Sequence, residues 1–395
     1  MQTVSAAEAA QRLGVKLETV YAYVSRGLLR RVPGDDKESR FELAQVERLA
    51  LRGRRSAEPK PAAWVVATEL TEATADAIRY RGEDAVALAG LVPFERVAEW
   101  LWAVPPEAAA PFVAPKAAVA LARSVQAALP EDAPPLERLR VTASVLGSTD
   151  PLRYDTSPAA VVAGARGLIA GLVDALPRLA AKSGATPQLA ARLYGRLAPS
   201  RATTARVRVL DVAMGLCADH ALSPSTLAVR IAAAQRADVY GVVQTGFGAL
   251  SGALHGAASL SAEELIGEVE AGADPAHVIG AKLRRGERIP GFGHALHGGH
   301  DPRAAALLAR VAETFGRSRA VDAAQRVVDV MVARGLPGPN VDWALAVLAC
   351  AAGMLRGASE AIMAVARVAG WIAHALEEYR SPTRFTAHAM YVGPK

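Results

Sequence analysis

Two apolar stretches indicate the fold class: ARGLIAGLVDALPRLAAK at residues 165–182 and DWALAVLACAAGMLRG at residues 342–357. Their apolar residues recur at the helical period, and alternating strand patterns are scarce in the rest of the chain. Hydrophobic residues make up 51% of the 395 residues and charged residues 21%, which allows a sizeable core and excludes a disordered chain. No repeat of about 20–50 residues is visible, which disfavours a solenoid. We therefore expect one large all-α unit over residues 65–395.

The composition also bears on the cellular location of the protein. The two cysteines, Cys217 and Cys350, cannot form a disulfide framework and lack zinc-site spacing, so we expect reduced core thiols. The longest stretch without charged residues, 239–262, contains serines, glycines and a histidine, and it is not the apolar run of about 20 residues that a bilayer requires. The N-terminus has no export-signal pattern. We expect a cytoplasmic protein without membrane contact.

The N-terminal residues differ in character from the rest. The whole chain carries a net charge of +6, and residues 1–60 account for +4 of it. Residues 4–30, VSAAEAAQRLGVKLETVYAYVSRGLLR, predict two short amphipathic helices that meet at Gly14. Ser5 and Glu8 have the spacing of a capping box. Gly27 stands where a glycine commonly ends a helix.

This pattern is typical of a helix-turn-helix, and residues 30–52 predict a hairpin wing and a third helix. The module resembles the winged helix-turn-helix of the MerR/excisionase group. Its candidate DNA contacts, on the polar side of the second helix, are Lys16, Thr19, Tyr23 and Arg26. The alternative is a small helical module used only for assembly. We expect a module over residues 1–55, a linker over 56–64 and the large unit from residue 65.

Acid-base candidates lie in three glycine-rich segments. The segments are GFGALSGALHGAAS (246–259) with His255, IPGFGHALHGGHDPRAAA (289–306) with His294, and GLPGPNVDWALA (335–346) with Asp342. Glycine lets the backbone approach a ligand closely, and histidine and aspartate exchange protons there. Each residue also has a purely structural alternative, as a hydrogen-bonded loop histidine or as a helix-start aspartate that the dipole favours.

Two other chemistries are disfavoured. The spacing of His294, His297 and His300 would suit a metal, but no carboxylate or thiol stands at a firm spacing beside them, so we expect no metal. Ser251 does not fit the GxSxG pattern of a hydrolase elbow.

Six blocks, taken in order, resemble the signature of the citrate synthase family over roughly residues 65–395. They are RYRGEDAVALA (79–89), ADHALSPST (218–226), SGALHGAAS (251–259), IPGFGHALHGGHDPRA (289–304), PNVDWALA (339–346) and ARVAGWIAHALEE (366–378). The resemblance implies an all-α fold with a large domain and a small domain at about residues 257–350. It also implies a homodimer that joins acetyl-CoA to oxaloacetate and uses no cofactor besides the acyl-CoA substrate.

The resemblance also implies roles for particular residues. Asp342 would remove the methyl proton, His255 would polarise the thioester carbonyl, and His294 would protonate the oxaloacetate carbonyl. The implied oxaloacetate ligands are His220, Arg303 and Arg367. Guanidinium groups suit such a dicarboxylate because they meet a carboxylate with two parallel hydrogen bonds.

The sequence departs from the family pattern in three places. Gly298 stands where a basic residue often contacts CoA, and the LHG block continues as LHGAASL. Thr386 stands where an arginine reaches the neighbouring subunit's oxaloacetate, with Arg384 or Arg380 as a substitute candidate. Two alternatives therefore remain open. One is a 2-methylcitrate synthase that uses propionyl-CoA, and the other is a DNA-binding metabolite sensor on the same fold.

Overall fold

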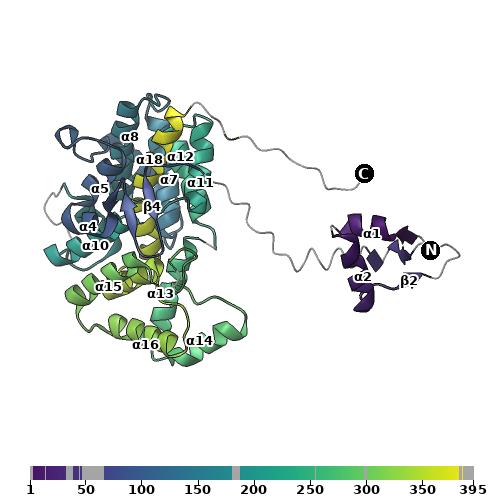
Figure 1. Cartoon of the computed structure of the whole chain (residues 1–395). Helices are drawn as coiled ribbons and strands as arrows, with labels where there is room; N and C mark the ends of the chain where they lie inside the picture. Colours follow the sequence, from purple (N-terminus) through teal and green to yellow (C-terminus); the bar gives the residue numbers. More distant parts are fainter. Residues whose placement is uncertain are drawn as a thin grey trace. The chain divides into compact units, whose positions relative to one another are not determined.

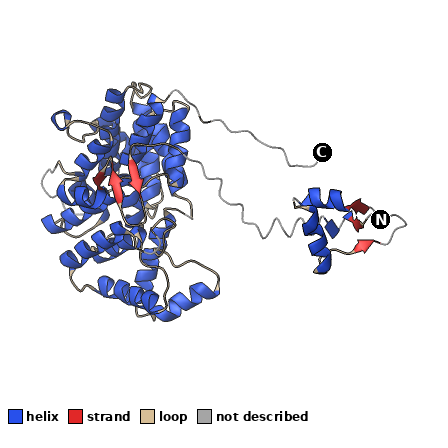
Figure 2. Cartoon of the chain, viewed as in Figure 1, coloured by secondary structure: helices blue, strands red, loops and turns tan. Residues whose placement is uncertain are grey.

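The structure, a computed structural model, consists mainly of helices (Figure 2). It divides into two units, Met1–Ala67 and Thr68–Lys395. The described residues are 3–13, 15–32, 39–43, 45–46, 66–179, 187–253, 255–297, 300–381 and 385. The expected linker, 56–64, lies outside the described residues.

The first unit contains two short helices and a small sheet. Its elements are β1 (Thr3–Ser5), α1 (Ala6–Leu13), α2 (Leu17–Ser25), β2 (Arg31–Val32) and β3 (Arg40–Glu42), with the antiparallel strand order β1-β3-β2. The predicted capping box is confirmed, because the Ser5 backbone N–H donates to Glu8 Oε2 at 2.9 Å and the Glu8 N–H donates to Ser5 Oγ at 3.2 Å. Gly27 has a φ of +72° just after α2, as a C-terminal glycine should. Most of the predicted third helix lies outside the described residues.

The second unit is the predicted helical unit with one small antiparallel sheet, which the sequence analysis did not predict. Its strands are β4 (Thr71–Ala73), β5 (Ile78–Tyr80) and β6 (Glu83–Asp84). Its helices are α4 (Ala85–Leu91), α5 (Phe94–Leu101), α6 (Lys116–Gln126), α7 (Pro135–Thr149), α8 (Pro158–Ala175), α9 (Leu189–Leu197), α10 (Thr204–Cys217), α11 (Pro224–Ala234), α12 (Val239–Leu250), α13 (Ala257–Glu270), α14 (Pro275–Arg284), α15 (Pro302–Phe315), α16 (Arg319–Ala333), α17 (Val341–Ala351) and α18 (Ala358–Arg380), with a short 3-10 helix at Pro106–Ala108.

Helix α18 forms the centre of the second unit (Figure 1). It is buried along nearly its whole length and packs on α7, α8, α10, α11, α12 and α17. The approach of α12 requires a glycine, because a Cβ at Gly246 would lie 2.7 Å from the ring of Trp371. A helix surrounded in this way places its own polar side chains, among them Arg367 and His374, in the interior.

Helices α13 to α16 gather at one end of this unit, where α17 connects them to α18 (Figure 1). Their mutual contacts run from α13 to α16 and α17, from α15 to α17, and from α14 to α16. The boundaries of a large and a small domain stay a prediction.

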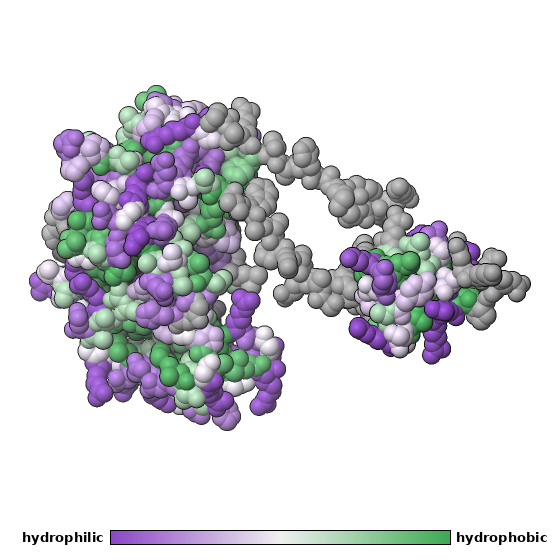
Figure 3. Space-filling view, in the orientation of Figure 1, coloured by the Kyte–Doolittle hydropathy of each residue, from purple (hydrophilic) through white to green (hydrophobic). Residues whose placement is uncertain are grey.

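Helix α8 is the one described helix that is long and apolar enough to cross a membrane by length and composition. It packs on α7, α9 and α18, and half of its residues are buried. These contacts are those of a core helix. The face of the molecule in Figure 3 shows hydrophilic and hydrophobic residues interspersed.

Candidate active site

The segment that carries His294 is fastened to the start of α17. Gly291 and Gly293 both have positive φ, +79° and +78°, and a Cβ at Gly291 would lie 2.9 Å from the backbone of Trp343. The Gly293 N–H donates to Gly338 O at 2.9 Å, and the Asn340 N–H donates to Gly291 O at 2.9 Å. Glycine is required because only it tolerates this backbone at such a short approach. The pairing brings two of the predicted glycine-rich segments together.

Asp342 lies in the first turn of α17. The Asn340 side chain caps the helix by accepting from the N–H groups of Asp342 and Trp343. The Asp342 carboxylate has no hydrogen bond to another described residue, and burial raises its pKa to about 6 against the opposing attraction of Arg303 and Arg367. A carboxylate with this pKa is charged at neutral pH and still basic enough to accept a proton.

The loop that carries His220 follows α10 and is held from two sides. The Tyr80 hydroxyl donates to the carbonyl oxygens of Leu216 and Asp219 at 3.1 and 2.9 Å. On the other side, the Gly370 N–H donates to Ala218 O at 2.9 Å. A Cβ at Gly370 would lie 2.4 Å from Asp219 Oδ1, so α18 approaches the loop as closely as glycine allows.

His220 forms a hydrogen-bonded pair with His297. Their Nε2 atoms lie 2.9 Å apart, and His297 Nδ1 lies 3.1 Å from Ala75 O. A carbonyl only accepts, so His297 Nδ1 carries the proton. With that proton on Nδ1, His297 Nε2 is the acceptor for the Nε2–H of His220. Burial and the charges of Arg303 and Arg367 push the pKa of His220 far below its usual range, so its ring stays neutral.

The tautomer of His294 follows in the same way. Its Nδ1 accepts from the backbone N–H groups of Leu296 and His297, at 3.1 and 3.4 Å. The proton of the neutral ring is therefore on Nε2. Burial lowers the pKa of His294 to about 4, with Arg303 and His297 as further causes. The ring is a neutral donor at pH 7.

Three histidines cluster here, and they are not the three that stand at three-residue spacing in the sequence. The ligand nitrogens of His220, His294 and His297 lie within 4.8 Å of one another, a distance that a metal ion could bridge, whereas His300 is exposed. The hydrogen bonds above, however, already use His297 Nδ1, His294 Nδ1 and the shared contact between His220 and His297. The cluster is therefore hydrogen-bonded in a way that leaves few lone pairs for a metal.

His255 lies in the turn between α12 and α13. Its Nε2 lies 2.8 Å from Ser225 Oγ, which in turn lies 3.1 Å from Ser223 Oγ at the start of α11. Burial lowers the pKa of His255 to about 4, and the charge of Arg367 acts in the same direction. His255 is therefore also neutral at pH 7.

Two buried arginines connect the candidate residues electrostatically. Arg303 and Arg367 are only 2% and 3% exposed, and their charges act on both His220 and Asp342. Asp301 holds Arg303 through Nε and Nη2 at 3.1 and 2.8 Å. Arg367 donates through Nε to Cys217 O at 2.8 Å. Each arginine keeps its Nη1 group without a partner among the described residues, which leaves donors for an anion.

Sequence reasoning missed three residues that build this site. The sequence presents His297 only as a possible metal ligand and Tyr80 only as part of a block, and it gives no sign of the role of Asp301 beside Arg303. Tyr80 lies in the YRG block, which was the one signal available for it. Arg384, Gly298 and Thr386 lie outside the described residues.

The candidate DNA contacts lie in the first unit. Lys16 and Arg26 are exposed at the two ends of α2, and Thr19 is half-buried. Tyr23 is half-buried and packs against the unit's small core, so it is partly a core residue instead of a free polar contact. Nearby, the Arg31 guanidinium lies 5.5 Å from the centre of the Tyr21 ring.

One protein family and several known proteins are similar to this chain in sequence. The family described as citrate synthase, C-terminal domain, matches residues 62–386. Citrate synthase 2 of Bacillus subtilis is 32% identical over 280 residues, which cover 67% of this chain and 74% of the relative. The 2-methylcitrate synthase of Shewanella oneidensis is 32% identical over 204 residues, which cover 51% of this chain and 53% of the relative.

Solved structures share the fold. The crystal structure of citrate synthase from Thermotoga maritima has a TM-score of 0.70 at 22% identity and covers 85% of this chain and 96% of its own. A citrate synthase from Thermoplasma acidophilum, solved as a ternary complex with carboxymethyl coenzyme A and oxaloacetate, has a TM-score of 0.67 at 21% identity and covers 85% and 95%. The chain therefore belongs to the citrate synthase family and is a transferase of that family's type.

Proposed function

We propose that this chain condenses an acyl-CoA with oxaloacetate and hydrolyses the resulting thioester, with Asp342, His255 and His294 as its catalytic residues. The observation that carries the proposal is a carboxylate whose pKa is raised to about 6, beside two buried arginines that also act on two neutral histidines. This set supplies a base, hydrogen-bond donors and an anion site together.

The first step forms the nucleophile. Asp342 takes a proton from the carbon next to the thioester carbonyl, and the electron pair moves to the carbonyl oxygen. That carbon is a very weak acid, so a fixed donor must stabilise the oxygen as its charge develops. A neutral His255 is such a donor, because its lowered pKa keeps it from competing with Asp342 for the proton.

The second step joins the two substrates. The enol carbon attacks the ketone carbon of oxaloacetate, and the Nε2–H of His294 donates to the ketone oxygen as it becomes an alkoxide. The free Nη1 groups of Arg303 and Arg367 bind the carboxylates. His220 offers the Nε2–H that it now gives to His297. Water then cleaves the thioester, which releases CoA and the tricarboxylate.

The donor acyl group is acetyl if the chain is a citrate synthase and propionyl if it is a 2-methylcitrate synthase. One extra methylene changes pocket affinity by only about 1–3 kcal/mol, so relatives of both kinds are compatible with this site. The homodimer expected from the resemblance, with Arg384 as its contribution to a neighbouring site, stays a prediction.

Release of free CoA thiol tests the proposal. Purified protein is given oxaloacetate with acetyl-CoA or with propionyl-CoA, and the ratio of the two kcat/KM values identifies the donor. Asp342→Asn, which keeps the size of the side chain and removes the base, should lower kcat at least about a hundredfold. Asp322→Asn, at an exposed aspartate in the first turn of α16, is the matched control and should be as active as wild type.

A metabolite sensor would give another result. Oxaloacetate would raise the melting temperature, while neither acyl-CoA would release CoA above the rate of Asp342→Asn. That outcome would refute the condensation proposal.

We also propose that the first unit binds DNA as a winged helix-turn-helix of the MerR type. The support is the helix pair α1 and α2, the β2–β3 hairpin and the exposed Lys16 and Arg26, neither of which pairs with a described carboxylate. A mobility-shift assay should show retention of DNA at low salt. Lys16→Ala with Arg26→Ala should weaken it and lower the salt slope by about 2.

The matched control replaces two exposed cations of the second unit, Lys116→Ala with Arg326→Ala. This control should bind DNA as wild type does. Equal weakening by both double variants would indicate non-specific charge, and a helical module that serves only for assembly would then be the better interpretation.

A further inference from the structure

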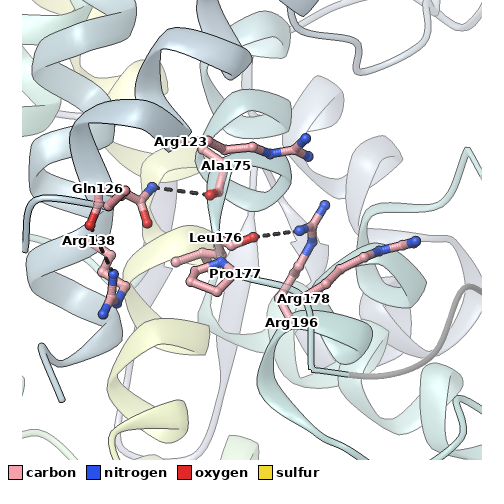
Figure 4. A pocket seen from close by; sticks show the side chains of 9 residues that line it. Arg123, Gln126, Arg138, Ala175, Leu176, Pro177, Arg178 and Arg196 are labelled. Carbon is pink, nitrogen blue, oxygen red and sulfur yellow. Dashed lines mark hydrogen bonds between the residues drawn. The ribbon is translucent and has the colours of Figure 1, made fainter. Parts of the chain in front are cut away.

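A cavity of about 690 Å³ lies between the ends of α6, α7, α8 and α9, and none of its lining residues belongs to the candidate active site (Figure 4). Its most prominent feature is the number of guanidinium groups. The arginines in its wall are Arg123, Arg138, Arg178 and Arg196. The apolar part of the wall includes Leu176 and Pro177. This volume is typical of small-molecule sites.

Backbone carbonyls hold three of these arginines. Arg196 is 9% exposed and donates from Nη1 to Leu176 O at 2.5 Å. Arg123 donates from Nη2 to Asp174 O at 2.7 Å, and Arg138 donates from Nη2 to Pro130 O at 2.9 Å. Carbonyl acceptors fix the direction of a guanidinium group and leave its full positive charge in place.

No carboxylate of the described residues forms an ion pair with any of these four arginines. The Asp174 carboxylate attracts Arg196 electrostatically, but it forms its ion pair with Arg192, at 2.7 Å. Arg178 is exposed and makes neither a hydrogen bond nor an ion pair with another described residue. The cavity therefore contains cationic groups in excess of the anions that surround them.

The mutual repulsion of these cations is visible at Arg196. Burial, together with the charges of Arg123, Arg178 and Arg192, lowers the pKa of Arg196 to about 10 against the attraction of Asp174. Positive charges that are held together without a counterion create a potential that an anion relieves.

We propose that this cavity binds an anion with two linked phosphate groups, such as inorganic diphosphate or the diphosphate of a nucleotide. The positive charge of several guanidinium groups exceeds the charge that one carboxylate can neutralise. A diphosphate, in contrast, offers about three negative charges and many acceptor oxygens. The planar guanidinium binds phosphate oxygens through two parallel hydrogen bonds. The apolar wall at Leu176 and Pro177 would additionally favour a nucleotide base.

Calorimetric titration of the full chain tests this site. Inorganic diphosphate and ADP are titrated separately at low salt, each with and without saturating CoA and oxaloacetate. Wild type should bind at least one of them, with an affinity that the two substrates do not change. Tighter binding of diphosphate would identify an inorganic ligand, whereas tighter binding of ADP would identify a nucleotide. Either result supports the proposal.

The key variant is Arg178→Ala, because this side chain supports no other described residue. It should weaken binding about tenfold or more, and Arg178→Lys should weaken it less, since it keeps the charge and loses the paired hydrogen bonds. Arg123→Ala is a second, independent variant. Arg326→Ala, at an exposed position on α16, is the matched control and should bind as wild type does. Without ligand, Arg178→Ala should condense its substrates at the wild-type rate.

Three results would overturn the proposal. One is the absence of binding of both ligands to wild type at low salt. Another is equal binding by wild type, Arg178→Ala and Arg123→Ala. The third is displacement of the ligand by CoA with oxaloacetate, which would place it in the condensation site.

Discussion

The carboxylate of Asp342 sets the expected pH dependence of the reaction. Burial raises its pKa to about 6, and the base must be deprotonated to act. The value of kcat/KM should therefore rise with pH through about pH 6, with a slope of one on a logarithmic scale. His255 and His294, whose pKa values are lowered to about 4, are already neutral in this range.

A pH–rate profile between pH 4.5 and 8 measures this rise of kcat/KM. A midpoint near the ordinary aspartate value, about 4, would mean that burial does not tune the base. A slope of two would mean that a histidine titrates together with Asp342.

His297 is expected to act as a positioning residue for His220. His297→Leu removes the acceptor of the 2.9 Å hydrogen bond and should raise the KM for oxaloacetate about tenfold, with a smaller effect on kcat. His297→Gln should recover most of the affinity, because an amide can donate to Ala75 O and accept from His220. The steady-state KM and kcat separate these effects.

The control for His297 is His300→Gln, because His300 is exposed. If His297→Leu lowered only the melting temperature and left the KM for oxaloacetate unchanged, His297 would be a structural residue alone.

At the scale of elements, the contact between α18 and the loop after α10 decides where His220 lies. Gly370→Ala places a Cβ 2.4 Å from Asp219 Oδ1 and 2.5 Å from Ala218 O, so either the loop or the helix must move. We expect a loss of about 1–3 kcal/mol in the free energy of unfolding, together with a higher KM for oxaloacetate. Urea denaturation measures the first and steady-state kinetics the second.

Gly267→Ala is the matched control on α13. It meets nothing within 4 Å and should stabilise the protein by up to about 1 kcal/mol, because alanine favours a helix more than glycine does. Equal stability of Gly370→Ala and wild type would contradict the close approach.

At the scale of the whole molecule, the chain has two separate hydrophobic cores. Val20 belongs to the small core of the first unit, and Leu345 belongs to the large core of the second. We expect two unfolding transitions, since a core is the cooperative unit of a domain. Val20→Ala should lower only one of them and Leu345→Ala only the other, each by on the order of 2 kcal/mol or more.

Differential scanning calorimetry of the full chain resolves these transitions. The exposed changes Leu17→Ala and Leu283→Ala serve as matched controls in the two units and should shift neither transition appreciably. A single transition that both core variants lower together would show that the units unfold as one.

The sequence by itself determined the helical class, the capping box of Ser5 and Glu8, the glycine end of α2 and, through its signature blocks, the family and the candidate residues from His220 to Arg367. These features are local, because a cap or a helical period depends on residues within about one turn of each other.

The tertiary structure alone decided the rest. The pairing of His220 with His297 joins residues 77 positions apart, and Tyr80 reaches Asp219 across 139 positions. The arginine cavity collects side chains from the ends of four helices. No sequence period encodes such contacts, because they arise only when buried helices pack and their remaining polar groups must find partners.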